Sequence, residues 1–324
     1  MLKSVILFAI GLVLLIKGGD WFVDGATGIA KRFNLPDIVV GATVVSIGTT
    51  LPEVMVSTTG ALQGSGAMAY GNAIGSIICN TALIAAISIT CNPGPVNVKS
   101  MKTPAIFFFC ASAIYCLAAY GLGTFPRWLG LVMLTVFVVY MVMTVRNGMK
   151  NPDAAAEEEA EETKDRALWQ ELLLLVVGAA VIAVGANLLV EHGQIIALGL
   201  GVPETVVALL FVALGTSLPE LVTTITSLKK GRASLGVGNV IGANVFNLVL
   251  VSGVAVTLAP FDVPVENELL NTGLNLSLVF DIPVMLLVMS LMIFPALATK
   301  KLHRWQGIAL LGIYAAFCVL QFVL

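Results

Sequence analysis

The sequence predicts an all-α membrane protein with ten transmembrane helices, arranged as two inverted five-helix repeats with broken motif helices. Three observations lead to this fold class. The 324 residues are 58% hydrophobic and only 11% charged, which is too apolar for a soluble protein of this length. A polar hexapeptide, Gly48–Glu53 (GTTLPE), recurs 167 residues later as Gly215–Glu220 (GTSLPE). Basic residues flank the two copies at opposite ends.

The hexapeptides belong to a tandem duplication. A 45-residue segment that begins at Pro36 aligns without a gap with one that begins at Pro203, with 16 identities. The same offset aligns residues 8–36 with residues 175–203, so the apolar N-terminal stretch is expected to be part of the fold and not a signal peptide. We expect a first transmembrane repeat at 1–150, an acidic cytoplasmic linker at 151–168 and a second, inverted repeat at 169–324.

Apolar runs of about 20 residues mark the spans, because this length crosses the hydrocarbon core of a bilayer as a helix. Each repeat contains five such runs. The expected spans are 4–30, 36–62, 70–90, 104–120 and 128–145, then 169–191, 203–228, 236–258, 281–298 and 306–323.

The basic residues predict the orientation. Lys31 and Arg32 precede the span of the first hexapeptide, whereas Lys229 and Lys230 follow the span of the second. Since cytoplasmic loops carry an excess of Lys and Arg, the two repeats are expected to have opposite orientations. With the N-terminus outside, 14 of the 17 basic residues fall in cytoplasmic loops. We therefore expect a multi-pass protein of the cell (inner) membrane with both termini extracytoplasmic.

Each hexapeptide places a proline and a glutamate inside an apolar run. The proline frees the carbonyl four residues back, on Gly48 or Gly215, beside threonine and serine hydroxyls. An ionisable residue near the bilayer centre costs roughly 2.5–3.5 kcal/mol and marks a functional site. Glu53 and Glu220 therefore indicate two halves of one oxygen-lined cation site.

Other classes of function lack their residues. The five cysteines show no CxxC spacing and the two histidines no HExxH spacing, which argues against a zinc site. An intramembrane protease would need that zinc motif or paired catalytic aspartates in adjacent spans, so no enzyme and no cofactor are expected. Nothing in the sequence points to nucleic acid or to a required protein partner. Small cations and the lipid bilayer remain as the expected partners.

The hexapeptides and the glycine motifs that follow them resemble a known family. GTTLPE with Gly71–Ser76 (GNAIGS), and GTSLPE with Gly238–Ala243 (GNVIGA), resemble the two alpha repeats of the cation/calcium antiporter superfamily, which includes sodium/calcium exchangers. The resemblance covers nearly the whole chain. It implies a secondary active antiporter that exchanges calcium for sodium by alternating access at a midplane site formed by both repeats.

Two alternatives stay open at this point. Protons or potassium are alternative counter-ions for calcium. A cation channel is the alternative class, since a channel can also use glutamates and carbonyls. Channels are usually built around a symmetric oligomeric pore, whereas this chain carries both half-sites itself, which favours the antiporter.

The resemblance also implies a ligand set for the transported ions. Glu53 and Glu220 would be the principal calcium carboxylates, and calcium takes six to eight oxygen ligands. Backbone carbonyls would come from Ser46 and Ala213. Hydroxyl, carbonyl or amide oxygens would come from Thr49, Thr50, Thr216, Ser217, Ser76, Asn80 and Asn247.

The chain departs from the family pattern at two positions of the second repeat. Ala243 stands where the family presents a serine, and Asn247 stands near a position that is often acidic. We expect these changes to alter sodium coupling and to leave calcium binding intact. A further intramembrane acid, Asp281, precedes Ile282–Pro283 and is expected to cap a helix start there, as Thr103 is before Pro104.

Overall fold

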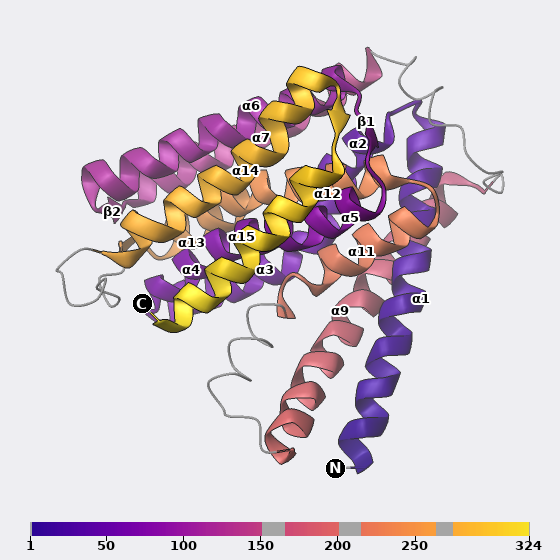
Figure 1. Cartoon of the computed structure of the whole chain (residues 1–324), viewed down its shortest axis with the longest axis horizontal. Coiled ribbons are helices and arrows are strands. Elements are labelled where there is room, and N and C mark those ends of the chain that lie inside the picture. The colour runs from indigo at the N-terminus through magenta and orange to yellow at the C-terminus, as the bar shows by residue number, and fades with distance from the viewer. Residues whose placement is uncertain (1, 151–165, 201–214, 264–274, 324) are drawn as a thin grey trace.

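The computed structural model describes residues 2–150, 166–200, 215–263 and 275–323, which are almost entirely helical (Figure 1). Helices satisfy every backbone hydrogen bond internally, as a bilayer requires. The α-helices are α1 (Leu2–Arg32), α2 (Asp37–Val40), α3 (Ser46–Leu62), α4 (Gly66–Cys79), α5 (Ala86–Cys91), α6 (Val98–Cys116), α7 (Arg127–Met149), α9 (Leu168–Gly199), α11 (Leu218–Lys229), α12 (Ala233–Phe246), α13 (Ser252–Leu258), α14 (Ile282–Thr299) and α15 (Arg304–Val323). Wider π-helical turns are η1 (Gly41–Val45), η2 (Asn80–Ala85), η3 (Leu117–Leu122), η4 (Asn247–Val251) and η6 (Ser277–Asp281).

Eight helical segments within the described ranges are long and apolar enough to cross a membrane. They correspond to eight of the ten expected spans. The expected span 203–228 lies partly outside the described residues. The expected span 306–323 is helical as α15 but is not among the eight.

Helix α12 forms the centre of the bundle. Every residue from Leu235 to Phe246 is buried, and the helix contacts α2, η1, α3, α6, α11 and η2. Two glycines permit the closest of these approaches. A Cβ on Gly238 would lie 2.3 Å from the Ile38 carbonyl oxygen, and one on Gly242 would lie 2.6 Å from the Ala42 Cα. Residues larger than glycine are therefore excluded where α12 meets α2 and η1.

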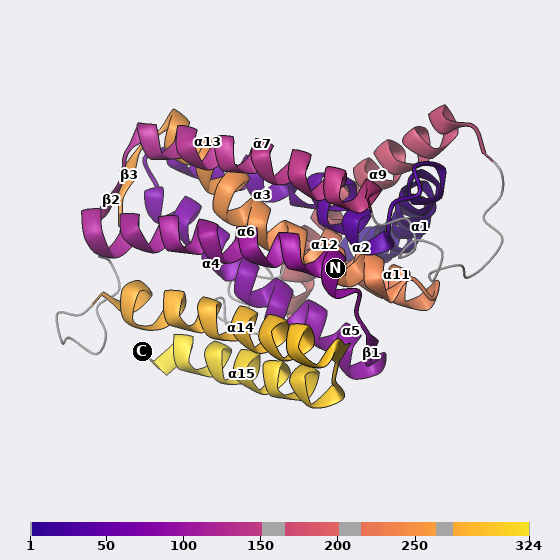
Figure 2. The same ribbon diagram turned by 90° about the horizontal axis from the view of Figure 1, so that it is seen from above.

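Helices α1 and α9 pack against each other and extend away from the rest of the bundle (Figures 1 and 2). Glycines on both helices lie at their crossing: a Cβ on Gly178 would lie 2.6 Å from the Phe22 nitrogen, and one on Gly25 would lie 2.6 Å from the Glu171 carbonyl oxygen. The pair meets the bundle chiefly at α11, beside which Lys230 forms a salt bridge with Asp24, and it also contacts α2, η1 and α3.

Two short antiparallel strand pairs connect the halves of the chain. Strand β1 (Gly94–Pro95) pairs with β4 (Lys301–Leu302), and β2 (Thr124–Phe125) pairs with β3 (Phe261–Asp262). The two pairs lie at opposite ends of the bundle (Figures 1 and 2).

The sequence predicts a break in each motif helix, and the helical irregularity lies at a different position relative to the motif in each repeat. In the first repeat α3 continues through Pro52, and the irregular turn η1 lies before the motif instead. The Pro52 ring therefore removes one hydrogen bond without ending the helix. In the second repeat α11 begins at the motif, with Pro219 in its first turn.

The expected helix caps at Asp281 and Thr103 are wrong. The helical turn η6 begins before Asp281, and the Asn275 side chain accepts hydrogen bonds from the backbone nitrogens of Ser277 and Leu278. Helix α6 likewise begins at Val98, where the Asn97 side chain accepts from the Ser100 nitrogen. In both places an asparagine upstream of the proline supplies the cap.

Candidate cation site

The two motif glutamates lie in the core of the bundle. Glu53 on α3 and Glu220 in the first turn of α11 are both fully buried, and the two helices are in contact. Thr50 Oγ1 donates to Glu220 Oε1 over 3.5 Å. Both Glu53 oxygens and Glu220 Oε2 have no hydrogen-bond partner. Burial of unpaired carboxylates is costly, so this arrangement suits a bound cation.

Neutral oxygens without partners come from three other predicted ligands. Ser217 Oγ and the side-chain amides of Asn80 and Asn247 are buried and unpartnered. Together with the three carboxylate oxygens they make six free oxygens, which is within the range that calcium uses. Asn80 and Asn247 are each the first residue of a π-helical turn, η2 and η4, and such turns often mark functional positions.

The elements that carry these groups are in mutual contact. Helix α3 contacts α4, α11 and η4, and α11 contacts η2. Cys79, the residue before Asn80, lies beside Ser217 and Glu220. Its sulfur accepts a hydrogen bond from the Tyr314 hydroxyl, which links α15 to this end of α4. The structure therefore brings both glutamates, Ser217 and the end of α4 into one region.

The motif threonines form a reciprocal contact between the repeats. Thr49 Oγ1 donates to Asn239 Oδ1 over 3.1 Å, and Thr216 Oγ1, at the matched position, donates to Asn72 Oδ1 over 3.4 Å. Asn72 Nδ2 in turn donates to the Glu53 carbonyl oxygen over 3.2 Å. Each asparagine therefore positions the motif of the opposite repeat. Sequence reasoning did not assign these two asparagines a role, although their recurrence in both glycine motifs was a signal.

Three further predicted ligands are Ser46, Ser76 and Ala213. Ser46 is buried and its hydroxyl donates to the Gly41 and Asn239 carbonyl oxygens, over 2.8 and 2.9 Å. Ser76 is buried on α4. Ala213 lies outside the described residues.

The donor set is poor in charge. Within the described ranges there is no cluster of three or more histidine, cysteine or acidic side chains that could hold a metal. An ion in this region would depend on two carboxylates and several neutral oxygens. Such a set suits hard cations such as calcium and sodium and disfavours metals that prefer sulfur or imidazole.

Comparison with known proteins identifies the family. The sodium/calcium exchanger protein family matches residues 3–146 and 171–323. The chain belongs to this family. The members are exchangers, that is, transporters rather than enzymes, and the chain is a multi-pass integral membrane protein.

Several relatives match this chain over most of its length. It is 28% identical to the sodium/calcium exchanger MaX1 of Methanosarcina acetivorans, over 98% of each chain. It is 31% identical to the inner membrane protein YrbG of Escherichia coli, over 81% of this chain and 82% of that protein. A structure of the sodium-calcium exchanger NCX_Mj superposes with a TM-score of 0.78 at 32% identity, covering 97% of each chain.

Proposed function

We propose that this chain is a secondary active antiporter that exchanges calcium for sodium at the buried site between α3 and α11. The observation that carries the proposal is the burial of Glu53 and Glu220 on contacting helices, with three of their carboxylate oxygens unpartnered and further unpartnered oxygens on the predicted ligands Ser217, Asn80 and Asn247. Without a cation the two carboxylates repel each other, so the conformational change that opens the site to the other side of the membrane is unfavourable while the site is empty. Because the site must hold a cation whenever it switches sides, the movement of calcium is coupled to the movement of sodium.

The ligands of the proposed site divide by charge. Glu53 and Glu220 balance the two charges of calcium, and Ser217, Asn80 and Asn247 supply neutral oxygens. Thr50 orients Glu220 through its hydroxyl. The other oxygens of the proposed site come from Thr49, Thr216, Ser76 and the Ser46 carbonyl.

We further propose that ten spans form two inverted repeats, at 1–150 and 169–324, joined by the cytoplasmic linker 151–168, with both termini extracytoplasmic. Strands β1 and β3 support this arrangement, because they are 167 residues apart in sequence and lie at opposite ends of the bundle (Figure 2). The distribution of basic residues supports the orientation. The match to an inner membrane protein of Escherichia coli supports placement in the cell membrane.

The test is calcium uptake into proteoliposomes under one imposed gradient at a time. An outward sodium gradient is expected to drive saturable calcium uptake, whereas outward potassium or proton gradients alone are not. Uptake that needs no counter-ion and does not saturate would identify a channel. Uptake driven by protons or potassium instead of sodium would replace the counter-ion proposed here.

A further inference from the structure

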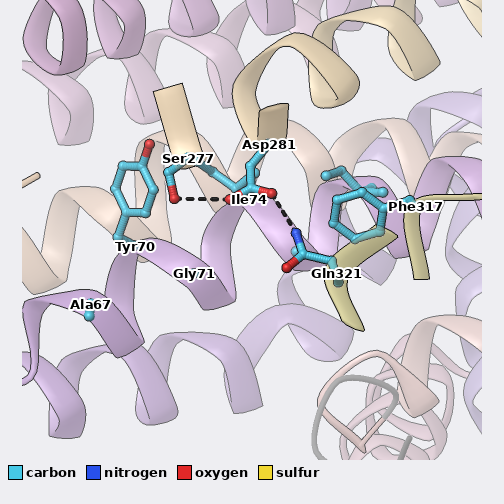
Figure 3. Close-up of a pocket in the computed structure, with 10 residues that line it drawn as sticks. Ala67, Tyr70, Gly71, Ile74, Ser277, Asp281, Phe317 and Gln321 are labelled. Atoms are coloured by element: carbon cyan, nitrogen blue, oxygen red, sulfur yellow. Dashed lines mark hydrogen bonds between the residues drawn. The ribbon is translucent and has the colours of Figure 1, made fainter. Parts of the chain in front are cut away.

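A cavity of about 250 Å³ lies between α4, η6 and α15 (Figure 3). Its α4 wall is Ala67, Tyr70, Gly71, Ile74, Gly75 and Ile78, and neither Glu53 nor Glu220 lines it. Gly71 and Gly75 expose the α4 backbone to the cavity, because no atom of a neighbouring element lies within 4 Å of where their Cβ atoms would be. The cavity is therefore distinct from the candidate cation site, although both use α4.

An acid faces this cavity from within a membrane-spanning segment. Asp281 accepts hydrogen bonds from Ser277 Oγ over 2.9 Å and from Gln321 Nε2 over 2.7 Å, as Figure 3 shows. These neutral donors fix the carboxylate but do not balance its charge. Among the described residues that line the cavity there is no lysine, arginine or histidine. An ionisable side chain within a membrane span is by default a functional-site hypothesis.

A second group in the cavity also lacks a partner. Tyr70 is only 2% exposed, lines the cavity and has a hydroxyl without a hydrogen-bond partner. Leaving such a group unsatisfied costs about 1–3 kcal/mol. Figure 3 shows this ring beside Ser277, and both residues line the cavity. A carboxylate, two hydroxyls and an amide thus line one cavity.

We propose that this cavity is a second cation site that binds one monovalent alkali cation at Asp281. One carboxylate neutralises one positive charge, whereas calcium would leave a net charge in a low-dielectric environment. Oxygens of Ser277, Tyr70 and Gln321 are hard ligands of the kind such ions take. A water molecule occupies about 30 Å³ in the liquid, so a cavity of about 250 Å³ has room for the ion and part of its hydration shell. The site lies outside the proposed exchange chemistry and holds an ion that the two motif glutamates do not.

The test is direct binding in a protein whose exchange site is disabled. In a Glu53→Gln/Glu220→Gln background, purified protein is titrated with radiolabelled sodium and, separately, with the potassium analogue rubidium. We expect saturable binding of about one ion per chain. Asp281→Asn should abolish it, and Tyr70→Phe, which removes one oxygen only, should weaken it. Asp262→Asn, at an exposed acid on β3, is the matched control and should leave binding unchanged.

The outcomes separate this site from the proposed exchange. Binding that survives Asp281→Asn overturns the second site whatever the exchange assay shows. Absence of sodium and rubidium binding in the disabled background also overturns it. Folding of each variant is checked by its melting temperature. Sodium should raise the melting temperature of the Glu53→Gln/Glu220→Gln background and should not raise it once Asp281→Asn is added, because a ligand stabilises only the state that binds it.

Discussion

At the scale of single residues, the two motif glutamates hold charge where water cannot stabilise it. Glu53 and Glu220 are fully buried, and three of their four carboxylate oxygens have no hydrogen-bond donor. A buried charge is tolerated when a partner charge is present, and in the site proposed here that partner would be the transported ion. In that proposal, the negative charge of the two glutamates is what calcium binding depends on.

We predict that Glu53→Gln and Glu220→Gln each abolish calcium exchange while the protein stays folded. The amide keeps the size of the side chain but removes one of the two charges that balance calcium. Radiolabelled calcium exchange in proteoliposomes measures the loss, and size-exclusion chromatography checks the fold. Asp262→Asn serves as the control that should exchange at the parent rate. Parent-level exchange in either glutamine variant would remove that residue from the site.

A second residue-scale prediction concerns Ala243 and Asn247. Ala243 is buried on α12 without a hydroxyl, and both amide atoms of Asn247 are unpartnered. Sodium, with one charge, depends on neutral oxygens more than calcium does. We expect Ala243→Ser/Asn247→Asp to steepen the sodium dependence of calcium exchange, because the variant adds a hydroxyl and a carboxylate that sodium can use. An unchanged sodium dependence in the double variant would contradict this.

The sequence was sufficient to single out Glu53 and Glu220, because a carboxylate in an apolar run has few explanations, and both side chains are buried in the structure. It did not predict the role of Asn72 and Asn239. Their partners, Thr216 and Thr49, lie 144 and 190 residues away, so the contacts depend on how the repeats pack. The assignment of the ligands themselves remains a prediction until ions are bound to the variants.

At the scale of helices, the two glycine motifs have the same sequence pattern but different surroundings. Gly238 and Gly242 on α12 lie against the backbone of α2 and η1, whereas Gly71 and Gly75 on α4 face open space. Sequence alone treats the four glycines alike. The same limit explains the wrong cap at Asp281: a local Asp-x-Pro pattern does not reveal that Asn275 has already begun the helix.

These surroundings predict opposite effects of one substitution. In Gly242→Ala the new Cβ would lie 2.4 Å from Ser46 Oγ and 2.6 Å from the Ala42 Cα, so backbone must move and the melting temperature should fall, by the equivalent of about 1–3 kcal/mol. In Gly75→Ala the Cβ enters open space, and alanine is favoured over glycine in a helix by about 1 kcal/mol. Its melting temperature should stay or rise. Equal losses in both variants would contradict the packing described for α12.

At the scale of the whole molecule, α1 and α9 make their most extensive contact with each other. Their mutual contact runs through glycines along both helices, whereas α1 meets α11 near Gly19 and through the Lys230–Asp24 salt bridge. A backbone-close glycine contact suits helices that move together. The contact of the pair with the core is less extensive than the contact between α1 and α9, so we expect this pair to shift against the core during each transport cycle.

A disulfide between α1 and α11 tests that movement. The Cβ that would be added at Gly19 lies 3.8 Å from the Thr226 Cβ, a distance typical of disulfides. With Val222→Ala to make room and the five native cysteines replaced, Gly19→Cys/Thr226→Cys should cross-link on oxidation. We expect calcium exchange to stop while calcium binding is retained, and exchange to return on reduction.

The matched control joins α1 to α9 instead. In Gly25→Cys/Leu174→Cys the Cβ atoms are 3.2 Å apart, but the new Cβ would also lie 2.6 Å from the Glu171 carbonyl oxygen, so the α1 and α9 backbones must move apart for the bond to form, and the reduced variant is first checked for exchange. Because α1 and α9 move as one unit in this scheme, the cross-linked control should still exchange calcium. Full exchange in the completely oxidised α1–α11 variant would show that the pair does not slide, and loss of exchange in the control would show that α1 and α9 move relative to each other.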